Sequence, residues 1–338
     1  MKFGIVGAGV IAEYHLEAIR RTEKAEIAGV YDKFPEAAKA FGEKHSIPVH
    51  PSIESLVQEG GAEVITIGTP SGWHLEPATQ AMEAGAHVLC EKPLEVTLDR
   101  IDRMIEVGKK MNKKIGGILQ VRTFPGCQQA KRILEEGRLG KLLLADAFIK
   151  YYRTQEYYES AGWRGTFELD GGGAAMNQGI HWIDLIQWLA GGAESVCAHA
   201  ATVGHQIEVE DVCLGMVQWK NGARGVIEAT TCAQPGFATR IEFHGEKGSL
   251  LLEDSQIKKF VIDGEDQPIE EGTTGAGGHA DPKKFSVEGH VIHVQDMIEA
   301  IEQDRDPLIP GHEARKSVEL IVSMYESSKK EGWVNLDD

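Results

Sequence analysis

The beginning of the chain constrains its fold more than any other stretch. Residues 2–6 are rich in β-forming side chains, and they are followed by Gly7-Ala8-Gly9-Val10-Ile11-Ala12 and a helical pattern over residues 13–22. A glycine turn between a strand and a helix is the setting in which a G-x-G-x-x-G/A pattern binds a dinucleotide pyrophosphate. Gly7 allows the tight turn, Gly9 lets the backbone approach the phosphates, and the small Ala12 lets the helix lie close on the strand.

An acid after the second strand predicts which dinucleotide is bound. A strand over residues 26–31 ends at Asp32, near the usual spacing from Gly7 for an acid that binds the hydroxyls of adenosine ribose. Because a carboxylate repels the 2′-phosphate of NADP, the sequence favours NAD, although Lys33 could partly offset that repulsion.

Strands and helices continue to alternate through the first third of the chain. We expect strands at residues 64–68, 88–90 and 114–121, and helices at 37–44, 52–59, 76–84 and 98–110. This alternation predicts an α/β domain with a doubly wound parallel sheet of the Rossmann type over residues 1–122. A second, α+β domain with a large, mostly antiparallel open sheet is expected over residues 123–338.

The composition of the 338 residues argues against several classes of protein. A net charge of −17 disfavours nonspecific nucleic-acid binding and docking on anionic membranes, which both need clustered Lys and Arg. The five cysteines include no C-x-x-C pair, so we expect reduced thiols in a cytoplasmic protein, with no disulfide and no structural zinc. No apolar stretch reaches the length of a membrane span, and the glycine-containing N-terminus is unlike a signal peptide.

A tripeptide in the first half supplies a candidate catalytic lysine. The apolar strand at residues 88–90 is followed by Glu91-Lys92-Pro93, and a proline cannot continue the hydrogen bonding of a sheet. Lys92 is therefore expected at the carboxyl end of a parallel strand, where open α/β sheets bind ligands. Taken alone, such a tripeptide is more often a solvated turn, but a partly desolvated lysine beside a cofactor can transfer a proton near neutral pH.

Together these motifs resemble one family of nicotinamide-dependent oxidoreductases. Gly7-Ala8-Gly9, Asp32, Thr69-Pro70 with His74, and Glu91-Lys92-Pro93 are similar to motifs of the glucose–fructose oxidoreductase, inositol dehydrogenase and rhizopine-catabolism (Gfo/Idh/MocA) family. The resemblance covers nearly the whole chain and implies a cis peptide bond between Lys92 and Pro93. The cofactor-binding residues expected from the fingerprint and the resemblance are Gly7, Ala8, Gly9, Val10, Ile11, Asp32, Thr69, Pro70, Ser71, His74, Glu91, Lys92, Gln120, Trp163 and Arg164.

Aromatic residues gather early in the second half. Residues 151–163 hold five of the chain's 23 aromatic residues. Such rings stack on the faces of sugars or polyols, but Tyr, Trp and Arg also gather at dimer interfaces, so both interpretations stay open for the tyrosines. Tyr158 is the candidate substrate-binding tyrosine. The family carries a similar Trp-Arg pair, which implies that Trp163 and Arg164 belong to the cofactor or substrate site.

Three polar residues lie on one face of the helix predicted over residues 174–189, after three glycines. Asn177 and His181 are four residues apart, and Asp184 lies near the same stripe. Spacing alone favours a satisfied core network. The resemblance instead implies that His181 faces the substrate. Inositol dehydrogenase-like members have an aspartate at the position of Asn177, so Asn177 is expected to bind a substrate hydroxyl or fix the tautomer of His181.

The remaining sequence predicts antiparallel strands and three more helices. The strands are expected at residues 141–152, 194–203, 212–219, 223–231, 239–245 and 249–253, and the helices at 125–136, 291–302 and 312–330. A glycine-rich loop over residues 272–282 contains His279. We expect no metal at His290 and His293, which lack a third ligand at metal-site spacing and could instead line the substrate cleft. An open sheet needs a cover, so we expect a homodimer or homotetramer formed through it.

The hypothesis from the sequence is an NAD-dependent dehydrogenase that oxidises a secondary hydroxyl of a sugar or cyclic polyol, inositol-, glucoside- or nucleotide-sugar-like. Lys92 and His181 are the catalytic candidates, with His181 preferred as the base and Lys92 holding the substrate oxygen, although the roles could be exchanged. Tyr158 and Asn177 complete the expected substrate site. The alternatives are an NAD-assisted glycosidase of the same fold and a non-catalytic cofactor-binding regulator, which would not need both Lys92 and His181.

Overall fold

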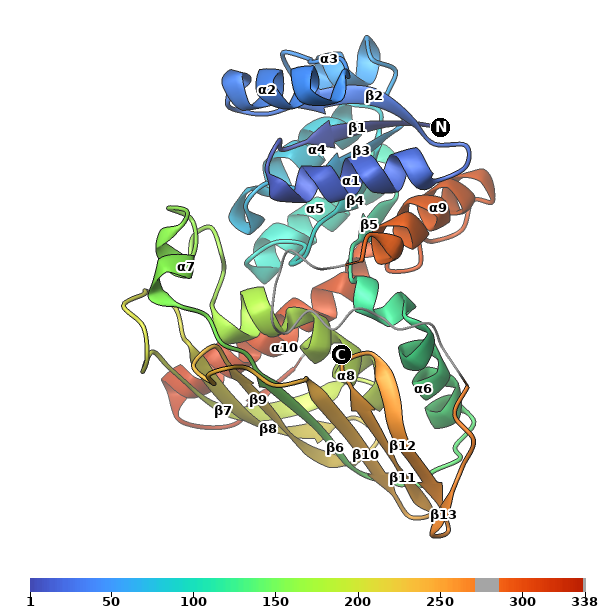
Figure 1. Ribbon diagram of the computed structural model, residues 1–338, viewed down its shortest axis with the longest axis vertical. Helices are drawn as coiled ribbons and strands as arrows, with labels where there is room; N and C mark the ends of the chain where they lie inside the picture. Colours follow the sequence, from blue (N-terminus) through green and yellow to red (C-terminus); the bar gives the residue numbers. More distant parts are fainter. Residues whose placement is uncertain (271–285, 337–338) are drawn as a thin grey trace. The chain divides into compact units, whose positions relative to one another are not determined.

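The structure is a computed structural model that describes residues 1–270 and 286–336, and it divides into two compact units (Figure 1). The first unit comprises Met1–Gln120 and Val287–Arg315, and the second comprises Val121–Ser286 and Lys316–Asp338. The expected domains were contiguous, so the return of residues 287–315 to the first unit differs from the sequence-based expectation.

The first unit is built on a five-stranded parallel sheet, as the alternation of strands and helices predicted. Its order is β2-β1-β3-β4-β5. The strands are β1 (Lys2–Val6), β2 (Glu26–Tyr31), β3 (Val64–Ile67), β4 (His87–Cys90) and β5 (Ile115–Gly117). Strand β5 is shorter than the predicted 114–121, because the chain enters a 3₁₀ turn at Gln120–Thr123.

Helices cover both faces of this sheet. They are α1 (Val10–Arg21), α2 (Pro35–His45), α3 (Ile53–Gln58), α4 (Leu75–Ala84) and α5 (Leu98–Met111). Helix α4 packs against both α3 and α5, whereas α1 packs beside a helix from late in the chain, α9 (Glu288–Glu302) (Figure 1). This division follows from right-handed crossovers, which place α1 and α3 on opposite faces when β2 and β3 flank β1.

Helix α9 joins the first unit because its apolar face completes that unit's core. Val294, Met297 and Ile298 are almost fully buried in the cluster that contains Leu16 and Ile19 of α1. Burying a side chain of this size contributes roughly 1.5–3 kcal/mol. The sequence predicted the helix but carried no local signal of where its apolar face would pack.

The second unit contains a nine-stranded mixed sheet. Its order is β13-β12-β11-β10-β6-β9-β8-β7-β14, and all neighbours are antiparallel except β6 and β9. The strands are β6 (Leu142–Lys150), β7 (Ala193–Ala201), β8 (Val212–Trp219), β9 (Arg224–Thr230), β10 (Arg240–Gly245), β11 (Gly248–Glu253), β12 (Gln256–Ile262), β13 (Glu265–Asp266) and β14 (Val334–Asn335). The last three were not predicted, while the mostly antiparallel sheet confirms the expected fold class.

The two faces of this sheet differ in what covers them. Helices of the second unit are α6 (Pro125–Glu135), α7 (Gln155–Glu159), α8 (Ile180–Ala190) and α10 (Gly311–Lys330), the last of which begins in the first unit. Helix α8 packs on β6, whose Ala145, Ala147 and Ile149 are fully buried. The opposite face, here named the outer sheet face, exposes apolar side chains of β6, β8 and β9, namely Leu144, Leu214, Met216 and Val226.

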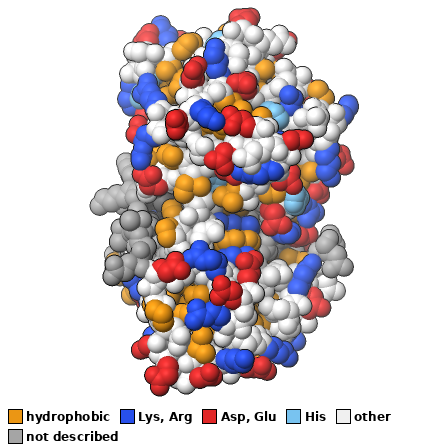
Figure 2. Space-filling view, turned by 90° about the vertical axis from the view of Figure 1, so that its right-hand side faces the viewer, with side chains coloured by type: hydrophobic (Ala, Val, Ile, Leu, Met, Phe, Trp, Pro, Cys, Tyr) orange, Lys and Arg blue, Asp and Glu red, His pale blue; other side chains and the backbone are white. Residues whose placement is uncertain are grey.

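The surface carries both signs of charge. In Figure 2, acidic and basic side chains are interspersed over the visible face, and the excess of acid in the composition does not gather there into one field. Within the described residues, no helix is both long and apolar enough to span a membrane. The predicted glycine-rich loop and its His279 fall entirely within positions 271–285, outside the described residues.

Candidate functional site

The glycine turn after β1 has the geometry of a phosphate-binding loop. Gly7 has a φ of +95°, and a Cβ atom built on it would lie 2.8 Å from the carbonyl oxygen of Gly68, so the turn requires glycine. A Cβ atom built on Gly9 meets no described atom within 4 Å, which leaves room for a ligand. Gly9 is the N-cap of α1 and brings no side chain to the first N–H groups, which can therefore hold the phosphates of a dinucleotide.

The other residues of the fingerprint separate into exposed and buried positions. Val10 is 72 % exposed at the start of α1, Ile11 is half-buried, and Ala12 is completely buried against the sheet. The small Ala12 thus packs as the third position of the fingerprint predicted, and the exposed Val10 flanks the open turn.

Asp32 is hydrogen-bonded to the same turn. Its Oδ2 accepts a hydrogen bond from the Ala8 N–H at 2.7 Å, and its Oδ1 accepts one from the Phe34 N–H at 2.8 Å. The Lys33 ammonium lies 4.7 Å from the centre of the Trp73 ring. The acid predicted to bind ribose is therefore fixed beside the phosphate-binding turn, and the neighbouring cation rests on an aromatic ring.

The loop after β3 is held by a buried histidine. Thr69 and Pro70 precede a short 3₁₀ turn that begins at Ser71, and His74 is 1 % exposed. Its Nδ1 lies 2.9 Å from the Pro93 carbonyl oxygen, and its Nε2 lies 3.0 Å from the Thr69 carbonyl oxygen. Since both ring nitrogens face backbone oxygens, His74 joins two loops, and its expected contact with the cofactor stays a prediction.

The Glu91-Lys92-Pro93 motif stands at the carboxyl end of β4, on the same edge of the parallel sheet as the glycine turn. The Lys92–Pro93 peptide bond is cis, as the resemblance implied. Lys92 is half-buried. Glu91 is buried, and its Oε2 accepts a hydrogen bond from the Lys92 backbone N–H at 3.2 Å.

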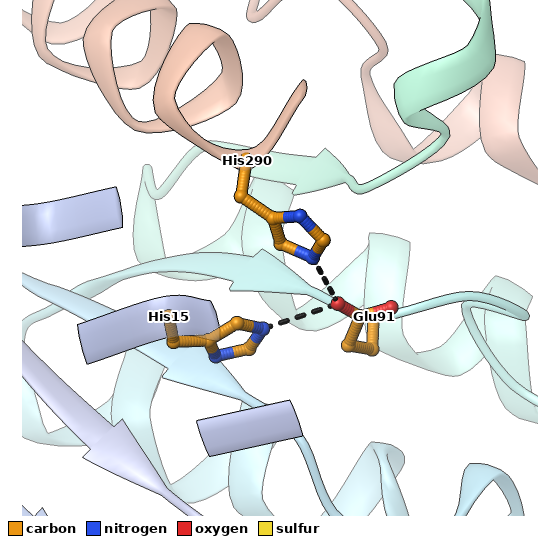
Figure 3. Close-up of side chains that lie close together, drawn as sticks. All are labelled: His15, Glu91 and His290. Carbon is orange, nitrogen blue, oxygen red and sulfur yellow. Dashed lines mark hydrogen bonds and ion pairs between the residues drawn. The ribbon is translucent and has the colours of Figure 1, made fainter. Parts of the chain in front are cut away.

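Two buried histidines converge on Glu91 (Figure 3). His15 of α1 donates from Nε2 to Glu91 Oε1 at 3.1 Å, and His290 of α9 donates from Nε2 to the same oxygen at 2.9 Å. A carboxylate only accepts hydrogen bonds, so both rings carry their proton on Nε2. Burial opposes ionisation of Glu91, but the two histidine donors outweigh it and hold the pKa of Glu91 well below its usual value.

The same burial keeps His15 uncharged. Desolvation lowers the pKa of His15 and outweighs the opposing influence of its hydrogen bond to Glu91. The cluster is therefore an ionised carboxylate with a neutral His15 donor beside it. Because Glu91 also accepts from the Lys92 N–H, this arrangement fixes the backbone that carries the candidate catalytic amine.

Sequence reasoning missed His15 and did not pair His290 with Glu91. Glu91 is 76 positions from His15 and 199 positions from His290 in the sequence, so no spacing rule connects the three residues. One signal was present: His15 lies three residues after Ala12 on the packed face of α1, an unusual place for a polar residue. The fold groups His290 with His15 and Glu91, and His293, with which the sequence paired it, is not part of this group.

The predicted residue Gln120 lies beneath α9. Its side chain is 6 % exposed, and a Cβ atom built on Gly289 would lie 2.4 Å from the Gln120 Cβ. The glycine therefore lets α9 approach closely, directly before His290. The close packing of α9 on Gln120 places Gln120 and His290 in one region of the first unit.

In the second unit, Arg164 lies between two aromatic rings. Its guanidinium carbon is 4.4 Å from the centre of the Tyr157 ring and 4.5 Å from that of Trp163. Arg164 donates to the Tyr157 hydroxyl, which also accepts a hydrogen bond from Gln178 at 2.9 Å. The predicted Trp-Arg pair is therefore joined to Tyr157 and Gln178, neither of which was among the predicted site residues.

The helix after the three glycines begins as a π-helix. Residues Ala174–Gly179 form the π turn, and α8 continues from Ile180. A Cβ atom built on Gly173 would lie 1.9 Å from the Glu210 carbonyl oxygen, so only glycine allows this approach. Glu210 accepts hydrogen bonds from the N–H groups of Gly173 and Ala175, yet its burial prevails and raises its pKa. Single π turns within helices occur frequently at functional sites.

The three polar residues expected to share a face have separate partners. Asn177 donates to the Asp170 carboxylate and accepts a hydrogen bond from Gln178 at 2.8 Å. Asp184 accepts two hydrogen bonds of 2.7 Å from Arg122 in a buried ion pair. His181 is 7 % exposed in the first turn of α8.

Tyr158, the tyrosine expected to bind substrate, is instead buried. It is 5 % exposed, and its hydroxyl is 2.8 Å from the Thr231 Oγ1. Burial raises the pKa of this phenol, because it disfavours the phenolate. The structure thus points to packing for Tyr158, while the less buried neighbour Tyr157 carries the contacts to Arg164 and Gln178.

Models of two protein families match the chain in succession. Residues 1–117 match the oxidoreductase family with an NAD-binding Rossmann fold, and residues 127–251 match the C-terminal domain of the GFO/IDH/MocA family. The chain therefore has an NAD-binding domain of an oxidoreductase followed by the second domain usual in that family.

Solved structures of two dehydrogenases resemble the whole chain. The WlbA dehydrogenase of Bordetella pertussis, in complex with NADH and UDP-GlcNAcA, is 30 % identical with a TM-score of 0.89, and the match covers 100 % of this chain and 98 % of that one. The WlbA dehydrogenase of Chromobacterium violaceum, in complex with the same two molecules, is 33 % identical with a TM-score of 0.88, covering 100 % and 96 %.

A third relative is also a dehydrogenase. The levoglucosan dehydrogenase of Pseudarthrobacter phenanthrenivorans is 26 % identical over 89 % of this chain and 86 % of its own length. The two matching family models and the full-length similarity agree with the glycine turn, Asp32 and the cis Lys92–Pro93 bond described above. This protein is an oxidoreductase of the Gfo/Idh/MocA family.

Proposed function

We propose that the protein is an NAD-dependent dehydrogenase that oxidises a secondary hydroxyl of a sugar or cyclic polyol. The observation that carries the proposal is the position of Lys92, half-buried at the carboxyl end of β4 and on the same sheet edge as the open glycine turn. Ligands of open α/β sheets bind at this edge.

The residues available for the dinucleotide fit its parts. The first N–H groups of α1 would hold the pyrophosphate, and Asp32 would hold the hydroxyls of the adenosine ribose. Thr69, Pro70 and Ser71 would border the ligand, with His74 supporting their loop from below. When bound, the nicotinamide ring supplies the hydride-accepting chemistry of the reaction.

NAD is favoured over NADP by the charge at Asp32. Its carboxylate accepts two backbone hydrogen bonds and would repel a 2′-phosphate. The nearest counter-charge in sequence, Lys33, is placed over Trp73. These contacts support NAD as the cofactor.

Lys92 and His181 are the proposed groups for the proton of the substrate hydroxyl. His181 would accept this proton as general base, and the Lys92 ammonium would hold the oxygen and stabilise the charge that develops on it. The reverse assignment uses the same two groups. A positioned acid–base group typically contributes about 10²–10⁴-fold to the rate. Asn177, fixed against Asp170, would orient a second hydroxyl of the substrate.

Among sugars, a nucleotide-sugar acid is the substrate class best supported by the relatives. Both WlbA dehydrogenases were crystallised with UDP-GlcNAcA, and both are at least 30 % identical to this chain over its full length. In this chain the aromatic–arginine arrangement of Trp163, Arg164 and Tyr157 provides a cation and stacking rings for such a substrate.

We also propose that the protein works in the cytoplasm as a homodimer or homotetramer. The five cysteines are free thiols in the structure, which suits a reducing compartment. The exposed apolar residues of the outer sheet face support association through this sheet.

The deciding experiment is a substrate panel combined with paired variants. UDP-sugar acids, inositols and free aldoses are offered with NAD or NADP, and reduced nicotinamide is followed by absorbance. Lys92→Met and His181→Ala should each lower kcat by about 10²–10⁴-fold. NAD affinity, measured by quenching of tryptophan fluorescence, should stay near wild type.

Matched controls are the exposed Lys110→Met and His199→Ala, which should keep wild-type turnover. If both site variants turn over like their controls, the assignment of Lys92 and His181 is wrong. Cleavage of a glycoside without net formation of reduced nicotinamide would instead support an NAD-assisted glycosidase. Binding of NAD with no reaction across the panel would support a regulator.

A further inference from the structure

The fold brings two groups of three metal-ligating side chains together. Within residues 1–270 and 286–336, these are His15, Glu91 and His290 in the first unit, and His205, Asp211 and Cys232 in the second. In each group the nearest ligand atoms all lie within 4.8 Å of one another. The second group takes no part in the proposed dehydrogenase chemistry, and none of its members stands close to another in sequence at a recognised metal-site spacing.

The second group lies where the β7–β8 connection meets the segment that follows β9. His205 belongs to the loop between β7 and β8, Asp211 immediately precedes β8, and Cys232 follows β9. Asp211 is completely buried and the His205 side chain is 7 % exposed. His205 and Cys232 line a pocket of about 340 Å³, together with Gly204 and Arg153. The site is therefore reachable from solvent while its carboxylate is held inside.

The hydrogen bonds of His205 set its tautomer. Its Nε2 lies 2.9 Å from the Arg153 carbonyl oxygen, which only accepts, so Nε2 carries a proton. The other nitrogen, Nδ1, lies 2.9 Å from the Asp211 Oδ2, which also only accepts. In the neutral ring, two acceptors would then face each other, and this contact needs a positive species between them, either a second ring proton or a metal ion.

The position of the Cys232 thiol favours a metal ion over a second ring proton, because a metal ion would also bind the sulfur. Cys232 Sγ is 3.8 Å from the same His205 Nδ1. Zinc bonds of about 2.3 Å to sulfur and about 2.0–2.2 Å to nitrogen and oxygen place neighbouring tetrahedral ligands roughly 3.3–3.5 Å apart. The observed 3.8 Å and 2.9 Å differ from this spacing by about half an ångström or less. The remaining pair, Cys232 Sγ and the Asp211 carboxylate, lies within 4.8 Å, so one ion could contact all three ligand atoms once the side chains move toward it.

The surroundings of the ligands resemble the outer shell of a metal site. A histidine that binds a metal almost always donates its other ring N–H to a carbonyl or carboxylate, and His205 does so to Arg153. Asp211 also accepts backbone hydrogen bonds from Val203 at 2.7 Å, Gly204 at 2.8 Å and His205 at 2.9 Å. A Cβ atom on Gly204 would lie 2.7 Å from the Cys232 sulfur, so the loop's approach depends on glycine.

The need for an acceptor at the second ring nitrogen excludes a metal at the first group, His15, Glu91 and His290. If His15 and His290 bound a metal through Nε2, each Nδ1 would carry the proton and need an acceptor. Both Nδ1 atoms are buried and have no hydrogen-bond partner within the described part of the chain. Their Nε2 atoms instead donate to Glu91, which satisfies them without an ion.

We propose that Cys232, His205 and Asp211 form a zinc site whose fourth position faces the pocket. A thiolate with an imidazole selects zinc among the abundant divalent ions, and three protein ligands leave one position for water or a donor atom of a bound molecule. The ion would displace the thiol proton and join the 203–205 loop to the end of β9. Sequence reasoning found no sign of such a site, because Cys232 lies 27 positions from His205 on a separate segment.

The test is direct measurement of zinc on the full-length protein. Wild-type protein, freed of metal with a chelator and dialysed, is titrated with Zn²⁺ against a chromophoric chelator, and bound metal is counted by mass spectrometry. We expect about one zinc per chain. Cys232→Ser and His205→Gln should weaken binding by at least about 100-fold. Cys197→Ser, a similarly half-buried cysteine elsewhere on the sheet, is the matched control and should bind like wild type.

A spectroscopic measurement separates this site from folding defects. Cobalt bound in place of zinc should give the near-ultraviolet thiolate charge-transfer band in wild type and in Cys197→Ser, and the band should vanish in Cys232→Ser. Circular dichroism of each variant checks that the fold persists. The proposal is overturned if wild type binds no zinc tightly, or if Cys232→Ser binds zinc and cobalt as wild type does. A second proton on His205 would then account for the contact with Asp211.

Discussion

At the scale of single residues, the protein stabilises two buried carboxylates, Glu91 and Asp184, each with a small set of hydrogen-bond donors. Glu91 accepts from two histidines and one backbone N–H, and the histidine donors hold this buried carboxylate in its ionised form. Asp184 uses the other solution, a two-bond ion pair with Arg122. Removing one partner from either arrangement would leave a buried polar group without its bonds, which costs more than the bond itself contributed.

His290→Phe tests the first of these arrangements. Loss of one donor to Glu91 should lower the free energy of unfolding by about 1–3 kcal/mol. The lowered pKa of Glu91 makes its ionised form a source of stability above the ordinary pKa of 4.5, lost as the pH falls below it. The variant should show less of this acid-dependent loss than wild type. Urea denaturation at several pH values measures both, with His199→Ala as control; equal stabilities would contradict the role.

Asp32→Asn tests the basis of cofactor choice. The amide keeps the size of the side chain and one acceptor oxygen for the Ala8 N–H, but it removes the charge. Two unit charges about 4 Å apart interact by about 1 kcal/mol even in water, so the ratio of kcat/KM for NAD to that for NADP should fall by at least about fivefold. An unchanged ratio would show that Asp32 does not face the ribose.

At the scale of elements, β4 carries a pH-sensitive contact at its start. Burial, together with Lys113 and Lys114, lowers the pKa of His87 to about 4. Its Nδ1 accepts a hydrogen bond from the Lys114 N–H at 2.9 Å, which only the unprotonated nitrogen can do. The pairing of β4 with the segment before β5 therefore includes a bond that acid removes.

His87→Gln should make this part of the protein less sensitive to acid. A histidine with a lowered folded-state pKa contributes stability that is complete above its unfolded value of 6.5 and is lost as the pH falls toward about 4. Wild type should therefore lose more stability than the variant between pH 6.5 and 4. Thermal melts across that range give the comparison, and parallel losses in the two proteins would refute the assignment.

Local patterns were sufficient for most elements and for the local geometry around the glycine turn and the end of β4. The Gly7 turn, the acid at Asp32 and the end of β4 at Pro93 follow from backbone geometry that the residues themselves impose, and they were predicted correctly. For the helices, the sequence mainly failed to predict which parts of the chain they would pack against. The apolar face of α9 is equally apolar whichever core it joins, and the π turn before α8 depends on the contact between Gly173 and Glu210.

The missed site residues share one property, which is that their partners lie far away in the sequence. His15, His290 and Glu91 meet only after α1, α9 and β4 have packed. Tyr157 and Tyr158 are adjacent and chemically identical, so only the burial of Tyr158 distinguishes the packing residue from the one that contacts Arg164. The assignment of Tyr158 to the substrate therefore stays a prediction, and its burial makes Tyr157 the more accessible tyrosine of the pair.

At the scale of the whole molecule, the outer sheet face is notable because it exposes large apolar side chains to solvent. Met216 pairs directly with Val226 across β8 and β9, and they are 52 % and 38 % exposed. Large exposed apolar side chains on neighbouring strands mark interaction surfaces. The net charge of −17 keeps separate molecules apart at long range, so association would depend on contacts at such a surface.

Met216→Lys tests association through the outer sheet face. Wild type should elute as a dimer or tetramer of the 37.0 kDa chain, and the variant should shift toward monomer because a charge would be buried at the contact. Light scattering after size-exclusion chromatography measures the mass. Leu308→Lys, an equally exposed apolar residue of the first unit, should leave the mass unchanged. A wild-type monomer, or an unaffected Met216→Lys oligomer, would count against this face.

The return of residues 287–315 to the first unit has a consequence for biosynthesis. Because α9 supplies Val294, Met297 and Ile298 to the same core as α1, the nucleotide-binding half cannot finish folding when its five strands leave the ribosome. It has to wait for a helix translated more than 160 residues later, after nearly all of the second sheet. A gene truncated after residue 120 should therefore yield an incomplete and aggregation-prone fragment, and because Lys316–Asp338 belongs to the second unit, that unit is completed only after the first.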